Sequence, residues 1–435
     1  MEKFFKLKEN NTDVKTEIIA GITTFMTMAY ILAVNPNMLA ETGMNPNGVF
    51  TATALASGIA TILMALLANY PFALGPGMGL NAYFTYTVVI RYGYSWQFAL
   101  TAVFIEGLIF ILLSFFKVRE LIFNSIPLEL KNAVSAGIGL FIAFIGLTNA
   151  GIIQNGQGTI TELGNVTDAA PLLAIIGILL TGVLVIKQVK GAILIGIVAT
   201  TLIGIPMGVT VIPQGFTPFS IPSGMGDVAF KFVGLKEVFS SKMLIVVFTF
   251  LFVDMFDTVG TLAGVASKTG MLDEDGNLPR VEKALLADAI GTTVGAAMGT
   301  STVTTYVESS AGVAEGGRTG LTSLTTGILF LISLFLSPIF LLIPASAITP
   351  ALVIVGLFMI SPVASIDWTD YTVAIPAFIT LIMMPFAYSI AEGIVFGMIS
   401  YTVLKTLTGH RKDVSLLMYI ISILFTLRYV FIAFK

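Results

Sequence analysis

Two aspartates lie three residues apart inside one of the most apolar stretches of the chain, VVFTFLFVDMFDTVGTLAG at 246–264. A carboxylate in hydrocarbon is costly, so an acidic residue within such a stretch is by default a candidate for function. Asp257 and Thr261 are four residues apart and share one face of a helix, and Asp254 lies one turn earlier. We therefore expect Asp257 to face a binding site, and we expect Asp254 to bond a neighbouring helix.

A second acid and an amide lie in two short apolar segments elsewhere in the chain. Glu308 falls in TTYVESSAG within segment 303–315, and Asn81 falls in GLNAY at the start of segment 79–91. Both segments are too short to cross about 30 Å of hydrocarbon at about 1.5 Å per residue. Irregular backbone survives at membrane depth only where protein covers it or where it lines a cavity. We expect the two segments to face each other and to point their helix N-termini into one cavity.

Asp257, Glu308 and Asn81 form the predicted site, in which two carboxyls and an amide hold a flat ligand with ring nitrogens and carbonyls. Two ionised carboxylates would repel each other, so we expect at least one to carry a proton. Asp257 and Glu308 would then couple proton entry to transport. Capping and helix–helix bonding are the alternative roles for these polar residues. Three threonines complete the candidate substrate contacts: Thr261, Thr305 and Thr24.

The composition is that of a polytopic α-helical membrane protein. Of the 435 residues, 56% are hydrophobic and 11% are charged, whereas soluble domains have about 45–50% apolar and about 25% charged residues. The net charge of −3 without a basic tract gives no sign of nucleic-acid binding, and the absence of cysteine excludes disulfides and thiolate metal sites. With one histidine, His410, and no HExxH motif, we expect no enzyme activity, no metal and no cofactor.

Apolar stretches of span length follow one another along the chain. The first series is expected near 18–34, 50–68, 79–91, 96–116, 131–149, 170–187 and 190–212. The second series is expected near 242–263, 281–299, 303–315, 320–343, 345–361, 372–387 and 389–408. A further apolar segment at 414–433 either crosses the membrane or lies along it.

The basic residues favour a cytoplasmic N-terminus, because cytoplasmic loops carry an excess of Lys and Arg. With seven spans in each half, most Lys and Arg fall in the inside loops, among them Lys117 and Arg119. The polar opening MEKFFKLKENNTDVKTE does not resemble a cleavable signal peptide. The few basic residues of the outside loops are Arg91, Lys231, Lys236 and Lys242.

The two halves carry matching features. GPGMGLNAYFTY (75–86) and GTSTVTTYVESS (299–310) each precede a short span, and a Gly-Leu-Phe follows each of them, at Gly139–Phe141 and Gly356–Phe358. An odd number of spans per repeat places the two copies in opposite orientation. Inverted repeats with short, interrupted segments at matching positions are typical of secondary transporters that bind substrate at the membrane midplane. Chance similarity between Gly/Thr-rich membrane segments is the alternative.

The candidate site residues lie in stretches that resemble a known family, the AzgA-like purine permeases of the nucleobase–ascorbate transporter superfamily. The resemblance covers nearly the whole chain, and it is the combination of stretches that makes it specific. The matching stretches are TEIIAGITTFMTMAYILAVNP (16–36), ALGPGMGLNAYF (73–84), IPLELKNAVSAGIGLFIAFIGL (126–147), FVDMFDTVGTLAG (252–264), TSTVTTYVESSAGVAEGGRTGL (300–321) and AIPAFITLIMMPFAYSIAEGI (374–394).

The resemblance implies an all-α fold of seven-plus-seven spans in an inverted repeat, with a core domain and a gate domain. Short strands precede the half-helices of spans 3 and 10 and meet at the substrate. The implied divisions are a cytoplasmic N-terminus (1–17), core segments 18–116 and 242–343, gate segments 126–212 and 345–408, an amphipathic connector (213–241), and a C-terminal segment with an extra apolar helix (409–435).

Members of the family import hypoxanthine, guanine or adenine with protons. By resemblance, the family's span-8 acid falls on Asp257, its span-10 acid on Glu308 and its span-3 amide on Asn81. Thr261 stands where uracil permeases carry a histidine, which leaves proton coupling to the carboxyls. We therefore expect proton symport of a purine base, guanine or hypoxanthine, across the cytoplasmic membrane. An adenine-preferring permease and an inorganic anion carrier on the same fold are the alternatives, and assembly as a homodimer is left open.

Overall fold

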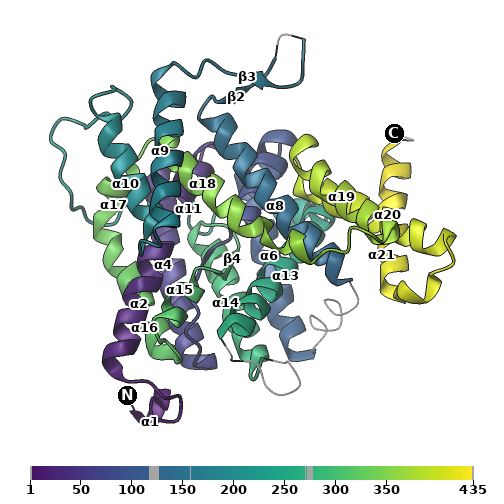
Figure 1. The fold of residues 1–435 in the computed structure, drawn as a ribbon, viewed down its shortest axis with the longest axis horizontal. Coiled ribbons are helices and arrows are strands. Elements are labelled where there is room, and N and C mark those ends of the chain that lie inside the picture. Colours follow the sequence, from purple (N-terminus) through teal and green to yellow (C-terminus); the bar gives the residue numbers. More distant parts are fainter. Residues whose placement is uncertain (1, 117–126, 157, 270, 272–277, 434–435) are drawn as a thin grey trace.

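The computed structural model describes residues 2–116, 127–156, 158–269, 271 and 278–433, which fold mostly into helices (Figure 1). Lys117 and Arg119 lie outside the described residues. The first half contains α1 (Glu2–Phe5), α2 (Val14–Met28), α3 (Ile31–Ala40), α4 (Pro46–Leu63), η1 (Met64–Ala68), β1 (Leu74–Pro76), α5 (Met78–Ala82), η2 (Tyr83–Arg91), α6 (Trp96–Phe116), α8 (Leu128–Asn149), β2 (Ile153–Gln154), β3 (Glu162–Leu163), α9 (Ala169–Ile186) and α10 (Ala192–Gly204). The connector and the second half contain α11 (Met225–Val228), α12 (Leu235–Val238), α13 (Ser241–Thr269), α14 (Val281–Met298), β4 (Val303–Thr305), α15 (Ser309–Ala314), α16 (Gly320–Ile332), η3 (Ser333–Leu336), α17 (Ser337–Leu341), α18 (Ala345–Ile360), η4 (Ser361–Ser365), α19 (Tyr371–Phe386), α20 (Ile390–Leu407), η5 (Arg411–Asp413) and α21 (Leu416–Ala433).

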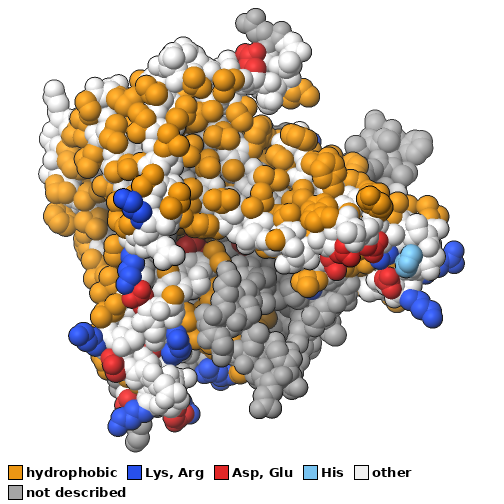
Figure 2. Space-filling view, in the orientation of Figure 1, with side chains coloured by type: hydrophobic (Ala, Val, Ile, Leu, Met, Phe, Trp, Pro, Cys, Tyr) orange, Lys and Arg blue, Asp and Glu red, His pale blue; other side chains and the backbone are white. Residues whose placement is uncertain are grey.

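Many of these helices have the length and composition that a membrane crossing requires. In the described part of the chain, eight helical segments meet both conditions, and α10 and α19 are shorter apolar helices. Apolar side chains cover the upper part of the face in Figure 2, whereas charged side chains gather at its lower edge and right end. The chain is therefore a multi-pass membrane protein.

Two short strands bring the two halves of the chain together. β1 and β4 pair antiparallel, with Leu74 opposite Thr305. The Gly77 N–H extends this pairing by donating to the Thr302 carbonyl oxygen at 2.9 Å. The short helices α5 and α15 follow the two strands, so the expected arrangement of strand and half-helix is confirmed.

The second half-helix begins later than the sequence suggested. Residues 303–305 form β4, and α15 starts only at Ser309. The three strand residues, Val-Thr-Thr, are all β-branched, which favours extended backbone over helix. The expected helical segment at 303–315 was therefore wrong in its first turn.

The two Gly-Leu-Phe sequences meet where α8 packs against α18. A Cβ built on Gly139 would lie 2.5 Å from the Gly356 carbonyl oxygen, and a Cβ built on Gly356 would lie 2.5 Å from the Gly139 carbonyl oxygen. Any larger residue at either position would push the helices apart, as is common for small residues between membrane helices. This reciprocal contact between matching residues is the geometry that an inverted repeat predicts for spans 5 and 12.

Helix packing separates the described helices into two groups. α8, α9, α10, α18, α19 and α20 pack on one another. A second group, which includes the β1–β4 sheet, consists of α2, α3, α4, α5, η2, α6, α14, α15 and α16. α13 packs against α6 and α15 of the second group and also reaches α8 of the first. The fold is thus the inverted-repeat transporter architecture expected from the sequence. The residue boundaries given for the core and gate domains stay predictions.

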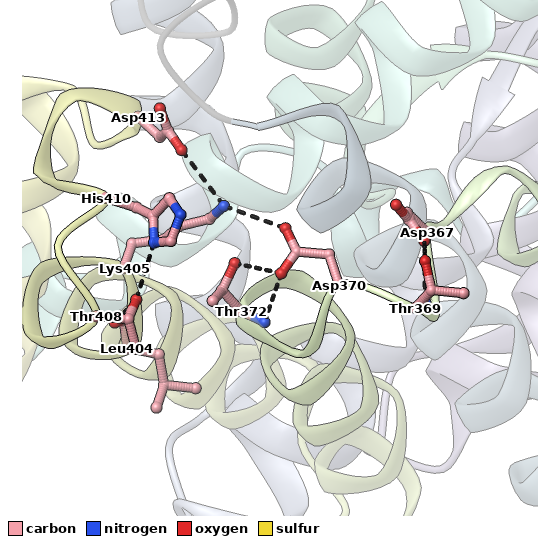
Figure 3. Close-up of polar contacts among 9 residues, drawn as sticks. All are labelled: Asp367, Thr369, Asp370, Thr372, Leu404, Lys405, Thr408, His410 and Asp413. Carbon is pink, nitrogen blue, oxygen red and sulfur yellow. Dashed lines mark hydrogen bonds and ion pairs between the residues drawn. The ribbon is translucent and has the colours of Figure 1, made fainter.

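The C-terminal segment is attached to the bundle through Lys405, near the end of α20 (Figure 3). The Lys405 side chain is 7% exposed, and its Nζ lies 3.4 Å from Asp370 Oδ2 and 3.4 Å from Asp413 Oδ2. Asp370 is the N-cap of α19, and Asp413 belongs to η5. One lysine therefore ties three segments together, and α21 packs against α20 beyond it.

Candidate functional site

A cavity of about 1200 Å³ lies between the two groups of helices. One wall comes from α2, the start of α5, α13, β4 and α15, and the other comes from α8, the turn between α9 and α10, and the end of α18. Four of the six residues proposed from the sequence line it: Asp257, Thr261, Thr305 and Glu308. All four belong to the wall that contains the sheet, whereas the opposite wall contributes polar residues of its own, among them Lys131 and Asn132.

Asp257 reaches the cavity from α13, beside the end of β1. A Cβ built on Gly77 would lie 3.2 Å from Asp257 Oδ2 and 2.5 Å from the Thr304 methyl carbon. Glycine at position 77 therefore lets the backbone approach the acid and the second strand at the same time. Thr261 lines the cavity one turn further along α13, on the face that the four-residue spacing assigned to both.

Glu308 directly precedes α15, and a phenol holds its side chain. Tyr30 Oη donates to Glu308 Oε1 at 2.7 Å, and Thr27 Oγ1 donates to the Glu308 carbonyl oxygen at 3.5 Å. Tyr30 is fully buried and lines the cavity. Sequence reasoning missed this residue, because a tyrosine within the apolar run MTMAYILA has no spacing that separates a site residue from a packing residue.

Thr305 presents an unused hydroxyl to the cavity. The residue is 2% exposed, and its Oγ1 has no hydrogen-bond partner among the described residues. A buried hydroxyl without a partner is unfavourable by about 1–3 kcal/mol. A ligand that offers a donor or an acceptor here would remove this penalty, and a hydroxyl can serve either.

Asn81 and Thr24 are not among the described residues that line the cavity. The Asn81 amide oxygen accepts from Ser301 Oγ, and its Nδ2 lies 3.5 Å from the Pro76 carbonyl oxygen. Asn81 thus joins the segment of β1 to the segment of β4 without lining the cavity. Thr24 Oγ1 donates to the Ala20 carbonyl oxygen at 3.0 Å within its own helix. In this arrangement, direct substrate contact by these two residues would need a local rearrangement.

Sequence comparison places the chain among known transporters. The model of the Permease family matches residues 15–396. The chain belongs to the nucleobase–ascorbate transporter family. It is accordingly a permease and not an enzyme.

Two relatives match this permease over nearly their whole length. It is 46% identical to the guanine/hypoxanthine permease PbuG of Bacillus subtilis, with 99% of this chain and 100% of the relative covered. It is 43% identical to the adenine permease AdeP of Escherichia coli, with 99% of this chain and 96% of the relative covered. Among solved structures, the transmembrane domain of the cyanobacterial bicarbonate transporter BicA aligns with a TM-score of 0.63 at 17% identity, covering 89% of this chain and 97% of that domain. At this identity, the likeness shows a shared fold.

Further acids of the permease lie behind the cavity wall. Thr258 Oγ1 lies 2.9 Å from Asp254 Oδ1, 3.2 Å from Asp288 Oδ2 and 2.7 Å from Thr304 Oγ1. Asp254 and Asp288 are fully buried. Thr258 therefore links α13, α14 and β4, which is the helix-bonding role expected for Asp254.

A polar cluster joins the two groups of helices at the far end of α8. Tyr86 Oη and Asn149 Nδ2 both donate to Glu41 Oε1, at 2.8 and 3.0 Å, and Asn149 Nδ2 lies 2.8 Å from Tyr86 Oη. The Tyr388 ring packs edge-on against the Tyr86 ring. Partial burial of its carboxyl raises the pKa of Glu41, while the hydrogen bonds from Tyr86 and Asn149 oppose this rise. We call Glu41, Tyr86 and Asn149 the Glu41 cluster.

The cavity and the Glu41 cluster lie at opposite ends of α8. The cavity is lined by Leu128 and Lys131 from the first turn of α8, and Asn149 is the last residue of the same helix. At about 1.5 Å per residue the helix separates Asn149 from Leu128 by roughly 30 Å, and from Ile138, the last α8 residue of the cavity lining, by roughly 17 Å. At the cavity end, Lys190 Nζ and Glu315 Oε2 form a partly exposed ion pair at 2.7 Å. The Glu41 cluster, with its exposed Glu41 and Asn149, therefore lies at one end of α8, and the cavity begins at the other.

Proposed function

We propose that this permease takes up purine nucleobases together with protons across the cytoplasmic membrane, with guanine or hypoxanthine preferred. The observation that carries the proposal is the meeting of Asp257 and Glu308, from different helices, on one wall of a single cavity. The purine permeases among the relatives support the substrate class. A cavity of about 1200 Å³ is large enough for a flat bicyclic base, since small-molecule sites span about 300–1,000 Å³.

Recognition would rest on a few hydrogen bonds in this otherwise largely apolar cavity. Asp257 and Glu308 would accept from ring N–H groups, and the unused hydroxyl of Thr305 would bond the carbonyl or amine at the six-position. Because a hydroxyl serves as donor or acceptor, Thr305 alone does not choose between guanine and adenine. A hydrogen bond to a charged group contributes about 1.5–3 kcal/mol, so each carboxylate can contribute about ten- to a hundredfold in affinity.

Transport would follow from exposing this cavity alternately to the two sides. With a cytoplasmic N-terminus, the cavity end of α8 faces the cytoplasm and the Glu41 cluster closes the outer side. Opening outward would separate the partners of the Glu41 cluster, because Glu41 and Tyr86 belong to one group of helices and Asn149 to the other. A proton on one of the cavity carboxyls would lower their mutual repulsion and permit an uncharged base to bind.

Uptake of radiolabelled hypoxanthine into proteoliposomes with an acidic exterior tests the proposal. We expect uptake to fall when unlabelled guanine or hypoxanthine competes, and to fall when an uncoupler removes the proton gradient. Competition by adenine alone would place the permease with the adenine carriers. Competition by sulfate or bicarbonate but by no purine would contradict the proposal, because two carboxyls at the site should repel anions.

A further inference from the structure

Tyr30 lines the cavity and bonds the carboxyl group of Glu308, although the sequence did not predict it as a site residue. It lies in the break between α2 and α3, is fully buried, and lines the cavity. Its hydroxyl donates to Glu308 Oε1 at 2.7 Å, a normal O–H···O distance. The contact joins the first span to the residue that precedes the half-helix of span 10, and both partners lie on the cavity wall that contains the β1–β4 sheet.

A second phenol beside it has a different partner. The rings of Tyr30 and Tyr306 are 6.5 Å apart, and both residues line the cavity. Tyr306 Oη donates to the Pro76 carbonyl oxygen at 2.5 Å, which ties β4 to the end of β1. Tyr306 therefore stabilises the β1–β4 sheet, while Tyr30 bonds the Glu308 carboxyl group.

We propose that Tyr30 is a positioning residue that keeps Glu308 Oε1 as a hydrogen-bond acceptor and so directs the transported proton to Oε2. The inference rests on the proposed function, because it names the atom that would carry the proton. In a protonated carboxyl one oxygen carries the hydrogen and the other is the carbonyl oxygen. Since the Tyr30 hydroxyl donates to Oε1, the arrangement that keeps this bond has its hydrogen on Oε2. The proton is then bound to and released from Oε2, while the bond from Tyr30 stays in place.

The same hydrogen bond also affects when Glu308 takes up its proton. A donor that bonds a carboxylate favours the charged form, because the bond to the charged form is the stronger one. The titratable groups that share the cavity wall with Glu308 are Asp257 and Tyr306, and Lys131 and the Lys190–Glu315 pair lie further along the cavity. Asp257 acts in the opposite direction to Tyr30, because a second negative charge favours a proton on Glu308.

Infrared difference spectroscopy of the full chain in lipid, titrated with acid, tests this inference without any substrate. The carbonyl stretch of a protonated carboxyl that is lost in Glu308→Gln reports Glu308. In Tyr30→Phe we expect this band to move to higher frequency, because its carbonyl oxygen loses a donor. We also expect its titration midpoint to rise by about one pH unit, because the midpoint reports the difference between the stronger bond to the carboxylate and the weaker bond to the protonated carboxyl.

Tyr70→Phe is the matched control. Tyr70 is also buried, and its hydroxyl donates to the Pro279 carbonyl oxygen, away from the lining residues of the cavity. This variant loses a comparable bond and should leave both the frequency and the midpoint of the Glu308 band unchanged. An equal shift in Tyr70→Phe would overturn the inference, since it would mark a general effect of packing.

Two further results separate this inference from the proposed function. If hypoxanthine uptake is normal but Tyr30→Phe changes neither the frequency nor the midpoint, Tyr30 does not direct the proton and the symport proposal stands. If the wild-type chain transports no purine but the Tyr30→Phe band shifts as expected, the link between Tyr30 and Glu308 holds and the proposed function fails. A wild-type spectrum without any band that depends on Glu308 would overturn the inference, because Glu308 would then bind no proton.

Discussion

Asn149 Nδ2 lies 3.0 Å from Glu41 Oε1, and this bond joins the two groups of helices at the end of α8 opposite the cavity. The bond is exposed to solvent, so its loss should shift the balance of inward and outward forms by about 0.5–1.5 kcal/mol, or two- to tenfold. Asn149→Ala should therefore populate the outward form more.

The shift can be measured by thiol labelling, because the chain contains no cysteine. Ser310→Cys places a single thiol on the cavity wall. In outward-oriented vesicles, a membrane-impermeant maleimide should label it two- to tenfold faster when Asn149→Ala is added. Asn165→Ala, in an exposed turn, is the control and should leave the rate unchanged. Equal rates in all three proteins would mean that Asn149 does not hold the outer side closed.

The pH dependence of the same equilibrium follows from the raised pKa of Glu41. Partial burial raises this pKa in the closed cluster, and opening to water would return it towards its ordinary value. The closed form therefore binds the proton more tightly, so a fall in pH from the raised value to the ordinary one should favour closure. A thiol reacts as the thiolate, so each rate is divided by the rate of the same thiol in denatured protein at the same pH. The normalised labelling of Ser310→Cys from outside should slow over this range, and Glu41→Gln should abolish this normalised pH dependence. Faster normalised labelling at acidic pH would contradict the assigned sign.

Asp257→Ala should weaken hypoxanthine binding by about ten- to a hundredfold, because it removes a hydrogen bond to a charged group. Radioligand binding to the purified protein measures this loss directly. Asp367→Ala is a suitable control, because Asp367 bonds Thr369 in an exposed loop. Unchanged affinity in Asp257→Ala would remove Asp257 from the substrate site.

Thr305→Val should lower affinity without lowering stability. Its hydroxyl has no partner among the described residues, so the variant loses no bond within the protein, while the bound base loses one of about 0.5–1.5 kcal/mol. Affinity should fall about two- to tenfold. Thr304→Val is the contrasting control, because Thr304 Oγ1 lies 2.7 Å from Thr258 Oγ1 and its loss should lower the thermal unfolding midpoint. A loss of stability in Thr305→Val would indicate that the hydroxyl is bonded within the protein.

Lys405→Met should destabilise the packing of α19, α20 and η5 and should leave substrate binding unchanged. Lys405 is buried, but Asp370 and Asp413 are 40% and 50% exposed, so we expect a loss of about 1–3 kcal/mol. Hydrogen bonds from Thr372, together with Lys405, lower the pKa of Asp370. Its contribution to stability is thus present above about pH 4 and is lost as the pH falls through the lowered value. Thermal unfolding in detergent should show both the lower stability of the variant and the loss of stability at acidic pH. A variant as stable as the wild type would mean that the ion pairs of Lys405 with Asp370 and Asp413 do not stabilise the fold.

Much of the fold could be predicted from the sequence, because hydrocarbon restricts the choices. Apolar runs indicated where most helices lie, and the Gly/Pro/Thr/Ser-rich stretches that precede segments 79–91 and 303–315 indicated extended backbone at matching positions. The two Gly-Leu-Phe sequences were predicted only to be matching features of the two halves, and the structure adds that Gly139 and Gly356 contact each other. The start of α15 was misplaced because apolar character alone does not distinguish a β-branched strand residue from a helical one.

The candidate site was harder to predict, because its geometry depends on side chains that meet across long distances in the sequence. Helix periodicity placed Asp257 and Thr261 on one face, and both line the cavity. No such period connects Tyr30 to Glu308, so their contact could not be foreseen. Asn81 was assigned by its position at the start of a half-helix, and the structure directs its amide to Ser301 behind the wall.

Simultaneous recording of base and proton movement tests whether the two are coupled at Asp257 and Glu308. Hypoxanthine added outside lightly buffered proteoliposomes should make the exterior more alkaline as the base enters. Both movements should be lost together in the double variant Asp257→Asn, Glu308→Gln. Entry of hypoxanthine without any change in external pH, or wild-type coupling in that double variant, would contradict this coupling.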